Sequence, residues 1–234
     1  MKIPTVIAMT VITTFPAYLH RYYELPEPAH DLWASGRLHE VLGIPDDQRT
    51  RVEIIGGEIV VSPGLNTLTH ARIASDIQSA VFLRGAPESD YPWRAVQNID
   101  FNAEHAGDGY TSDLIALSAE VFSAAATQHA RHLTAEQIGM AVEITSEATA
   151  ADDREPDRQR TRPTKWNGYA HEGVEFYLLV DRAPDKRCVT LYSDPDLPEG
   201  VYDSAKTWEF GETVTLPEPF EVEIPTEGWL PWER

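Results

Sequence analysis

A single acid interrupts the apolar run Met140-Ala141-Val142-Glu143-Ile144. A short and otherwise continuous apolar run of this length is typical of a strand that is covered on both faces of a sheet. A second run of the same kind, Leu114-Ile115-Ala116-Leu117, begins directly after Asp113. We therefore expect two buried central strands that each carry one carboxylate.

The residues before these strands predict a β-hairpin and a helix. Gly56-Gly57 is a two-residue turn signal between two β-like runs, residues 52–55 and 58–61. Thr67 can cap a helix whose first turn contains His70. The apolar residues that recur at four-residue spacing in this helix are Ile73, Ile77 and Val81.

The remaining elements complete an α+β pattern. A strand is expected over residues 91–101, followed by a polar loop over residues 102–109. After the second central strand, we expect a helix over residues 163–172, ended by Gly173, and a strand over residues 174–180. The order hairpin, helix, three strands, helix, strand predicts an α+β fold in which a mostly antiparallel sheet carries one helix on each face.

The length of the chain, 234 residues with 42% hydrophobic, predicts one large domain with appended ends. We place the domain at residues 51–225, between an N-terminal extension of residues 1–50, with a short helix near residues 29–42, and a tail of residues 226–234. The apolar run at residues 6–15 is too short to span a bilayer, which takes about 20 residues, and we interpret it as an extension or an edge strand.

The charge balance limits the partners that the protein can have. Nineteen Lys and Arg residues against 38 Asp and Glu give a net charge of −19. This charge argues against general electrostatic binding to nucleic acid or to an anionic membrane, so any phosphate site must be local. Cys188 is the single cysteine in the sequence, which excludes an internal disulfide and a Cys-based zinc framework. A reducing cytoplasm is the expected location.

Asp113 and Glu143 are the candidate metal ligands. A carboxylate flanked by Val142 and Ile144 on a central strand is costly to bury in its ionised form unless a cation meets it. Two such acids on adjacent strands supply hard oxygen ligands of the kind that Mg²⁺ takes, together with waters and phosphate oxygens of a substrate. The alternative is that each acid ends a strand or pairs with an arginine.

A local excess of positive charge is the candidate phosphate-binding surface. Five of the 19 basic residues lie within twelve positions, where there are only two acids. In such an acidic chain this segment predicts phosphate contacts, and the alternative is an exposed loop followed by a helix start. The five basic residues are Arg154, Arg158, Arg160, Arg162 and Lys165.

Other motifs with a known chemistry are missing from the sequence. It contains no P-loop and no GxGxxG, GxSxG or HExxH motif, so nucleotide-binding, serine-hydrolase and zincin functions lack support. His70 is a lone histidine at a helix start, for which packing or capping is the alternative to a catalytic role. We interpret Cys188 as an inert core residue of a β-like run.

Several short motifs follow one another in a defined order. They are Glu53-Ile-Ile-Gly-Gly-Glu58, His70, Ser112-Asp113-Leu-Ile, Val142-Glu143-Ile-Thr-Ser146, Lys165, Tyr169-Ala170 and Gly173-Val174-Glu175-Phe-Tyr-Leu-Leu-Val-Asp181. This series, within about residues 27–225, resembles the Uma-two family of restriction endonucleases, which belongs to the PD-(D/E)XK nuclease superfamily. The resemblance implies an αβββαβ core with a central mixed sheet flanked by helices, an N-terminal β-hairpin extension and C-terminal β-strands.

The resemblance also implies a site and a reaction. The metal-binding acids of the superfamily fall on Asp113 and Glu143, the backbone carbonyl of Ile144 can add a ligand, and the lysine falls on Lys165. The implied reaction is hydrolysis of a DNA phosphodiester with Mg²⁺ or Mn²⁺, in which Lys165 orients the attacking water or stabilises the phosphorane charge. Supporting catalytic roles are expected for Glu53, Glu58 and His70, and phosphate contacts for Arg158, Arg160 and Arg162.

The sequence departs from the superfamily pattern at two positions. Ser112 replaces the proline expected before Asp113, a change that affects only the backbone shape. Thr145 occupies the lysine position of the E-x-K motif, so the cation must come from the following helix, at Lys165. The segment of residues 150–164 is also longer than the usual link.

Two other classes of function stay open. The same scaffold can serve as a catalytically silent module that binds a nucleic-acid end or a protein, and an acidic surface can contact basic partners in a scaffold protein. Retained affinity without Mg²⁺ binding would indicate the first, and failure to bind nucleic acid at low salt would indicate the second. A homodimer is also expected from exposed β-like edges near the C-terminus and from Trp229-Leu230-Pro231-Trp232.

Overall fold

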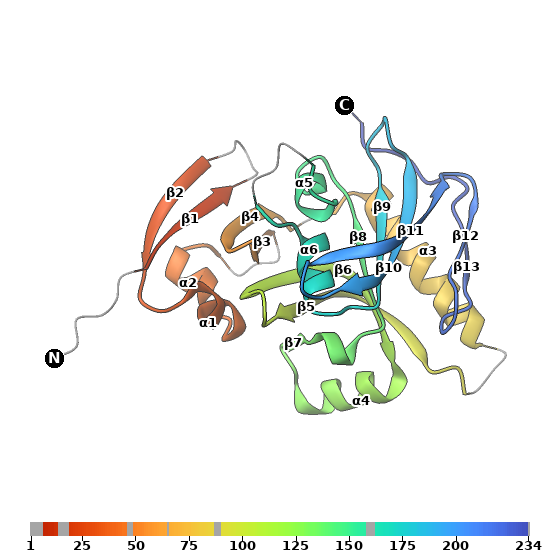
Figure 1. Cartoon of the computed structure of the whole chain (residues 1–234), viewed down its shortest axis with the longest axis horizontal. Helices are drawn as coiled ribbons and strands as arrows, with labels where there is room; N and C mark the ends of the chain where they lie inside the picture. Colours follow the sequence, from red (N-terminus) through yellow and green to blue (C-terminus); the bar gives the residue numbers. More distant parts are fainter. Residues whose placement is uncertain are drawn as a thin grey trace.

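The computed structural model describes residues 7–13, 19–45, 49–64, 66–86, 90–157 and 162–233. Within these residues, eleven strands form one mixed sheet and two short strands form a separate ribbon (Figure 1). The strands of the main sheet are β1 (Ile7–Thr13), β2 (Leu19–Leu25), β3 (Thr50–Ile55), β4 (Glu58–Pro63), β5 (Trp93–Ala103), β6 (Asp108–Ser118), β7 (His132–Leu133), β8 (Met140–Ile144), β9 (Phe176–Asp181), β10 (Cys188–Asp196) and β11 (Val201–Glu209). Those of the ribbon are β12 (Thr213–Thr215) and β13 (Glu223–Pro225).

The strand order in the main sheet is β11-β10-β9-β8-β6-β3-β4-β1-β2, with β5 paired to β6 and β7 paired to β5. Among the helices that the structure describes, none combines the length and the apolar character of a membrane span. The helical segments are α1 (Ala29–Ala34), α2 (Leu38–Leu42), α3 (Leu68–Gly85), α4 (Ala119–Gln128), the 3-10 turn η1 (Ala135–Gln137), α5 (Ala150–Asp153) and α6 (Lys165–His171).

The centre of the molecule has the predicted αβββαβ order, formed by α3, β5, β6, β8, α6 and β9. β5 and β6 are antiparallel, as are β6 and β8, whereas β8 and β9 are parallel and are connected through α6. The hydroxyl oxygen of Thr67 accepts a hydrogen bond from the backbone N–H of His70, which confirms the predicted cap of α3. The α+β class with a central mixed sheet flanked by helices is confirmed.

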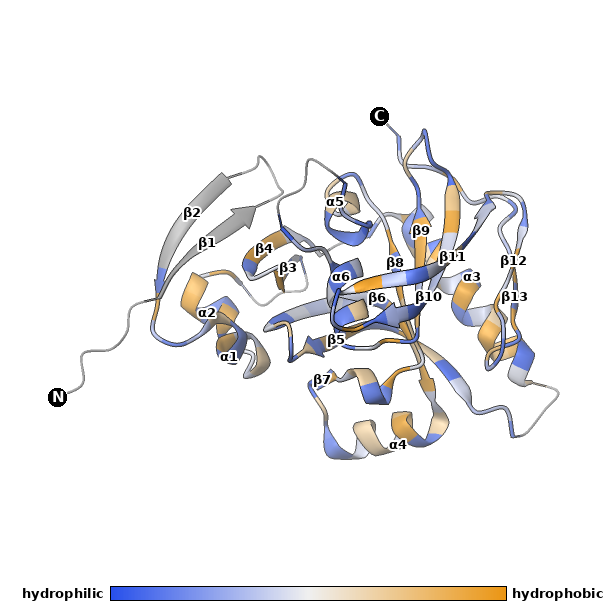
Figure 2. Cartoon of the chain, viewed as in Figure 1, coloured by the Kyte–Doolittle hydropathy of each residue, from blue (hydrophilic) through white to orange (hydrophobic). Residues whose placement is uncertain are grey.

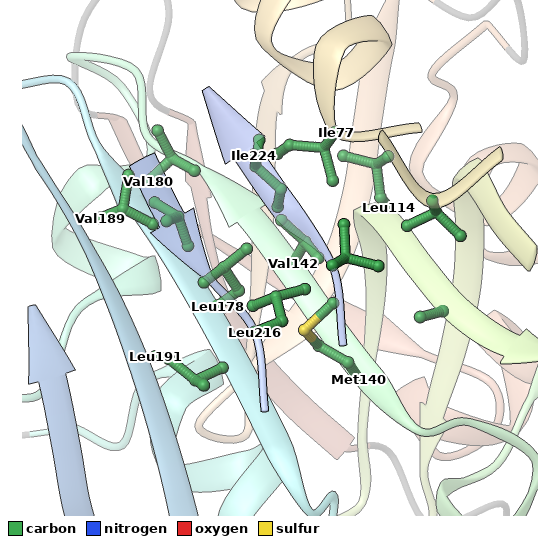
Figure 3. Close-up of a cluster of buried hydrophobic side chains, with 14 of the residues drawn as sticks. Ile77, Leu114, Met140, Val142, Leu178, Val180, Val189, Leu191, Leu216 and Ile224 are labelled. Atoms are coloured by element: carbon green, nitrogen blue, oxygen red, sulfur yellow. The ribbon is translucent and has the colours of Figure 1, made fainter. Parts of the chain in front are cut away.

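Alternating residues of β8 divide the core into two layers. Met140, Val142 and Ile144 pack in one cluster with Ile77 of α3, and Figure 3 shows part of this cluster. Ala141, which lies between Met140 and Val142, packs in the cluster that contains Trp166 and Tyr169 of α6. Hydrophobic colouring accordingly follows β8 and β9 at the centre of the sheet (Figure 2). The two helices therefore cover opposite faces of the same central strands.

The structure differs from the sequence prediction in three places. Two helices, α1 and α2, replace the single helix expected over residues 29–42, because Gly36 adopts a positive φ of 74° between them. β6 is much longer than the apolar run 114–117, and the predicted loop over residues 102–109 shrinks to a tight turn between Ala103 and Asp108. Helix α4 was not predicted, because it buries none of its side chains and so lacks an apolar stripe.

The two ends of the chain pack onto the domain. β1 pairs in parallel with β4, and it therefore belongs to the same sheet as the hairpin. Trp229 is buried and its indole N–H donates to the Asp76 carboxylate at 2.9 Å, which removes it from any exposed dimer surface. Cys188 begins β10 and is half-buried, so it is not the core residue we expected. The domain boundaries at residues 50 and 225 stay predictions, as does a homodimer.

Candidate active site

The central sheet splits where β6 exchanges one partner for another. On the same edge, Leu114 pairs with Val142 of β8, while Gly109 pairs with Ile54 of β3. Between these points two carboxylates accept the backbone hydrogen bonds that a ladder would otherwise make. Asp113 Oδ2 accepts from Ile144 N at 2.8 Å, and Glu53 Oε1 accepts from Thr111 N at 2.9 Å.

A kink in β6 directs Asp113 into this split. Tyr110, an even-numbered residue, packs in the cluster on the α6 face, but farther along β6 the odd-numbered Ile115 and Leu117 pack there. The side chains therefore change face at Asp113. On β5, Asn98 lies opposite this point and has a positive φ of 54°, a conformation that asparagine tolerates better than most residues. Asp113 consequently lies near the plane of the sheet and not in either packed layer.

Asp113 is held as a carboxylate by its neighbours. Its Oδ1 atom accepts from Arg51 Nη2 at 2.8 Å, and its Oδ2 atom lies 3.1 Å from His70 Nε2. Burial alone would oppose ionisation, but the Arg51 guanidinium, His70 and the N–H of Ile144 outweigh it and hold the pKa of Asp113 well below its ordinary value. His70 thus contacts Asp113 directly, and its supporting role in catalysis stays a prediction.

Glu143 faces the other layer, toward α6. Its Oε1 atom accepts a hydrogen bond from the Tyr169 hydroxyl at 2.9 Å and one from Lys165 Nζ at 3.3 Å. The side chain is only 1% exposed. Burial raises the pKa of Glu143 well above its ordinary value, and the nearby carboxylates of Asp153 and Asp113 add to this effect.

Lys165 is the first residue of α6, which begins with a capping box formed by Thr164 and Asn167. Its Nζ atom lies 2.8 Å from Glu53 Oε1, in addition to its contact with Glu143. Burial disfavours the charge on Lys165, but the surrounding carboxylates prevail and raise its pKa well above the ordinary value. The structure thus brings Lys165 to the acids, as the resemblance implied.

Thr145, at the position of the missing lysine, has a structural role. Its hydroxyl oxygen accepts from the backbone N–H of Arg182 at 2.8 Å, and the side chain is fully buried. It therefore links the end of β8 to the residue after β9.

Two residues of the site were not predicted. Asp153 of α5 is buried beside Lys165, with Oδ1 at 3.6 Å from Nζ, and burial raises the pKa of Asp153 to about 7. Nothing in the sequence separates Asp153 from the other acids of its charged segment. Arg51 could have been identified from the sequence. Residues two apart on a strand lie on the same face, so Arg51 shares a face of β3 with Glu53, which was already a candidate.

Glu58 and Arg162 lie together in a different place. Glu58 begins β4 next to the hairpin turn, and its Oε2 atom is 3.3 Å from Arg162 Nε. Arg162 also forms an ion pair with Asp152 and donates to the carbonyl of Ile55 at 2.9 Å. Contact of Arg162 with DNA and a catalytic role for Glu58 stay predictions, and these contacts do not favour either one. Arg158 and Arg160 lie outside the described residues.

Most of the other site residues line one cavity of about 660 Å³, whereas Glu53 and Tyr169 lie behind its wall and do not line it. Its wall includes Asp113, Glu143, Asp153 and Lys165, and Trp232 of the C-terminal tail closes one side. No group of three or more His, Cys, Asp and Glu side chains in the described part of the chain has the geometry of a metal site.

The chemistry of the donors nevertheless fits a hard divalent cation. Four buried acids face one buried lysine, one partly buried arginine and His70, so acids outnumber the permanently charged cations in the cluster. Carboxylate oxygens are the ligands that Mg²⁺ and Mn²⁺ prefer. The acids are Glu53, Asp113, Glu143 and Asp153, and the cations are Arg51 and Lys165.

Comparison with known proteins assigns the family. Residues 38–227 match the Uma2 family, which is described as "Putative restriction endonuclease". The chain belongs to the Uma2 family. This confirms the resemblance found in the ordered motifs from Glu53 to Asp181.

A solved structure shares the Uma2 fold seen here. It is described as a putative nuclease belonging to DUF820 from Anabaena variabilis, and it superposes with a TM-score of 0.50 at 19% sequence identity. The match covers 78% of this chain and 89% of that one. No curated protein matches the chain.

Proposed function

We propose that this Uma2-family protein is a metal-dependent endonuclease that hydrolyses DNA phosphodiester bonds. The observation that carries the proposal is the meeting of Asp113, Glu143 and Lys165 in one cavity, from two adjacent strands and the following helix. The descriptions of the family and of the similar structure, as a restriction endonuclease and a nuclease, support the same reaction.

Asp113 and Glu143 would hold Mg²⁺ or Mn²⁺, with the carbonyl of Ile144 as a further ligand. Such an ion, when bound, supplies an activated water and neutralises charge on the phosphate. Lys165 would donate from Nζ to a phosphate oxygen or to the attacking water, and Asp153 would hold that ammonium in place.

The other side chains position these groups. Tyr169 donates to Glu143 and fixes its carboxylate, and His70 does the same for Asp113. Glu53 contacts Lys165 Nζ on the side of β3. We also propose phosphate contacts for Arg158, Arg160 and Arg162.

A cleavage assay tests the proposal. Supercoiled, linear and single-stranded DNA would be incubated with the protein and Mg²⁺ or Mn²⁺, beside the Glu143→Ala variant. Cleavage by the parent that requires the metal and is lost in Glu143→Ala is the expected result. Equal cleavage by both proteins, or no cleavage of any of the three substrates with either ion, would overturn the proposal.

A silent binding module on the same scaffold is the second candidate. The observation that favours it is the contact of both Asp113 oxygens with Arg51, His70 and the N–H of Ile144, because these groups already satisfy the carboxylate. For a metal to bind to Asp113 Oδ1, the hydrogen bond from the Arg51 guanidinium to that atom would have to break.

The two candidates differ in their response to divalent metal. In the enzyme, Mg²⁺ or Mn²⁺ should stabilise the folded state, by about 2.7 kcal/mol at a concentration one hundred times the dissociation constant. The melting temperature is measured with and without the ions at constant ionic strength, and the Glu143→Gln variant serves as the control that should respond less. Identical melting temperatures at saturating metal would indicate the binding module.

A further inference from the structure

A second cavity of about 540 Å³ adjoins the proposed catalytic cavity. The two cavities share four lining residues, among them Arg51, His70 and Asp113. Asp113 therefore lines both cavities, and whatever occupies the second cavity lies next to the proposed metal ligand. The volume is within the range of about 300–1,000 Å³ that is usual for small-molecule sites.

An aromatic surface forms one part of this second cavity. Trp33 of α1 lines it and is partly exposed. The indole packs directly on the backbone of β6, since a Cβ atom added at Gly109 would come within 2.3 Å of the ring. The rings of His30 and His132 lie beside it, with centroids at 6.3 and 5.9 Å, and help to hold the indole in place. The exposed part of Trp33 is thus a fixed flat surface, of the kind on which a nucleobase stacks. It lies before the residues 38–227 that match the Uma2 family.

A cation lies on the same cavity. Arg131, which precedes β7, is exposed and lines the cavity, and its guanidinium crosses Gly36, where an added Cβ would meet Nη2 at 1.7 Å. Among the described residues, Arg131 donates no hydrogen bond. Arg131 therefore offers a guanidinium group that suits phosphate oxygens, whereas the guanidinium of Arg51 already donates to Asp113 and Asn98.

Polar side chains of β5 line the cavity as well. The Asp100 carboxylate accepts from the Thr111 hydroxyl at 2.7 Å, and Asn98 Oδ1 accepts from Arg51 at 3.2 Å. Carboxylate and amide groups can read the donors and acceptors on the edge of a base. An aromatic face, guanidinium groups and acceptor groups in one cavity match the parts of a nucleotide.

We propose that this cavity binds one nucleotide of the substrate strand, with its base stacked on Trp33 and its phosphate held by Arg131. The proposal rests on the proposed nuclease function and deepens it. It gives the protein a pocket for a single unpaired or flipped-out base next to the scissile phosphate, so strand structure or base identity at that position would affect cleavage.

Calorimetric titration of the full-length protein with deoxynucleoside monophosphates tests the proposal. The probes are dAMP, dGMP, dCMP and TMP, with inorganic phosphate as a separate arm. The parent should bind at least one nucleotide, and Trp33→Ala should weaken that binding about tenfold, the size of one lost base stack. Arg131→Gln should also weaken it severalfold, and Trp33→Phe should restore most of what Trp33→Ala loses.

Arg94→Gln is the matched control. Arg94 is also an exposed arginine, but its guanidinium donates to the backbone carbonyls of Tyr91 and Trp93, and it does not line this cavity. Its substitution should leave the affinity unchanged. Three outcomes would overturn the proposal. The parent binds none of the four nucleotides, or Trp33→Ala and Arg131→Gln both bind them with the affinity of the parent, or inorganic phosphate binds as tightly as the nucleotides.

The outcome for the pocket is separable from the outcome for the enzyme. Nucleotide binding should persist in Glu143→Ala, because Glu143 does not line the second cavity. If that variant loses cleavage while no nucleotide binds to the parent, the nuclease stands and the pocket is wrong. If nucleotide binding depends on Trp33 and Arg131 while Glu143→Ala cleaves like the parent, the pocket stands and the proposed catalytic site at Glu143 is wrong.

Discussion

Replacing Lys165 with methionine should lower the free energy of unfolding by about 3–5 kcal/mol, the usual cost of removing one partner from a buried ionic cluster. The ammonium is 1% exposed and contacts Glu53, Glu143 and Asp153. Without it, three buried acids face one another, and they must take up protons or admit water. The expected loss is therefore much larger than that of an exposed ion pair.

Urea denaturation of the parent and the variant measures this loss. Lys186→Met, at an exposed lysine, is the matched control and should change the stability little. Adding Asp153→Asn to Lys165→Met should recover about 1 kcal/mol or more, because one of the uncompensated charges is removed. If Lys165→Met is as stable as Lys186→Met, the lysine does not hold the acids together.

Replacing Glu143 with glutamine should have the opposite pattern, a large loss of cleavage with little loss of stability. The amide keeps the size of the side chain and can still accept from Tyr169, and burial already disfavours the charge of Glu143, as its raised pKa shows. The missing carboxylate removes a proposed metal ligand, so the cleavage rate should fall by about 10²- to 10³-fold or more.

Cleavage rates and DNA affinities of Glu143→Gln and Glu147→Gln provide the measurement. Glu147 lines the same cavity but is exposed, so its substitution removes one negative charge from the cavity without changing the buried cluster. Glu147→Gln should cleave at nearly the parental rate. A Glu143→Gln protein that cleaves like Glu147→Gln would contradict a metal-binding role for Glu143.

The sequence predicted the elements that carry strong local patterns. The apolar run of β8 has the bounds seen in the structure, and Thr67 caps α3 as its residue type indicates. Asp113 and Glu143 lie on the adjacent strands β6 and β8, as expected from two buried apolar runs that each carry one acid. The position of Lys165 came from the family resemblance, because a helix start by itself carries no such information.

Tertiary packing fixed the parts that the sequence did not predict. The direction of Asp113 depends on a kink shared with Asn98 of the neighbouring strand, and no local pattern predicts such a kink. Asp153 belongs to a charged segment of the kind that is usually exposed, and only the packing of α5 against α6 buries it. The sequence also did not predict the ion pairs of Arg162 with Glu58 and Asp152, while its contact with phosphate stays a prediction.

Asp113 and Glu53 have a structural role besides the proposed catalytic one, because their carboxylates bridge the gap between β6 and its neighbouring strands. Asp113 and Glu53 each accept a main-chain hydrogen bond, so both residues would still stabilise the fold of a relative without the proposed nuclease activity. Their presence in a relative is therefore poor evidence that the relative is active. Glu143 accepts only from the side chains of Tyr169 and Lys165, so under the proposed function its absence from a relative would be a clearer sign of inactivity.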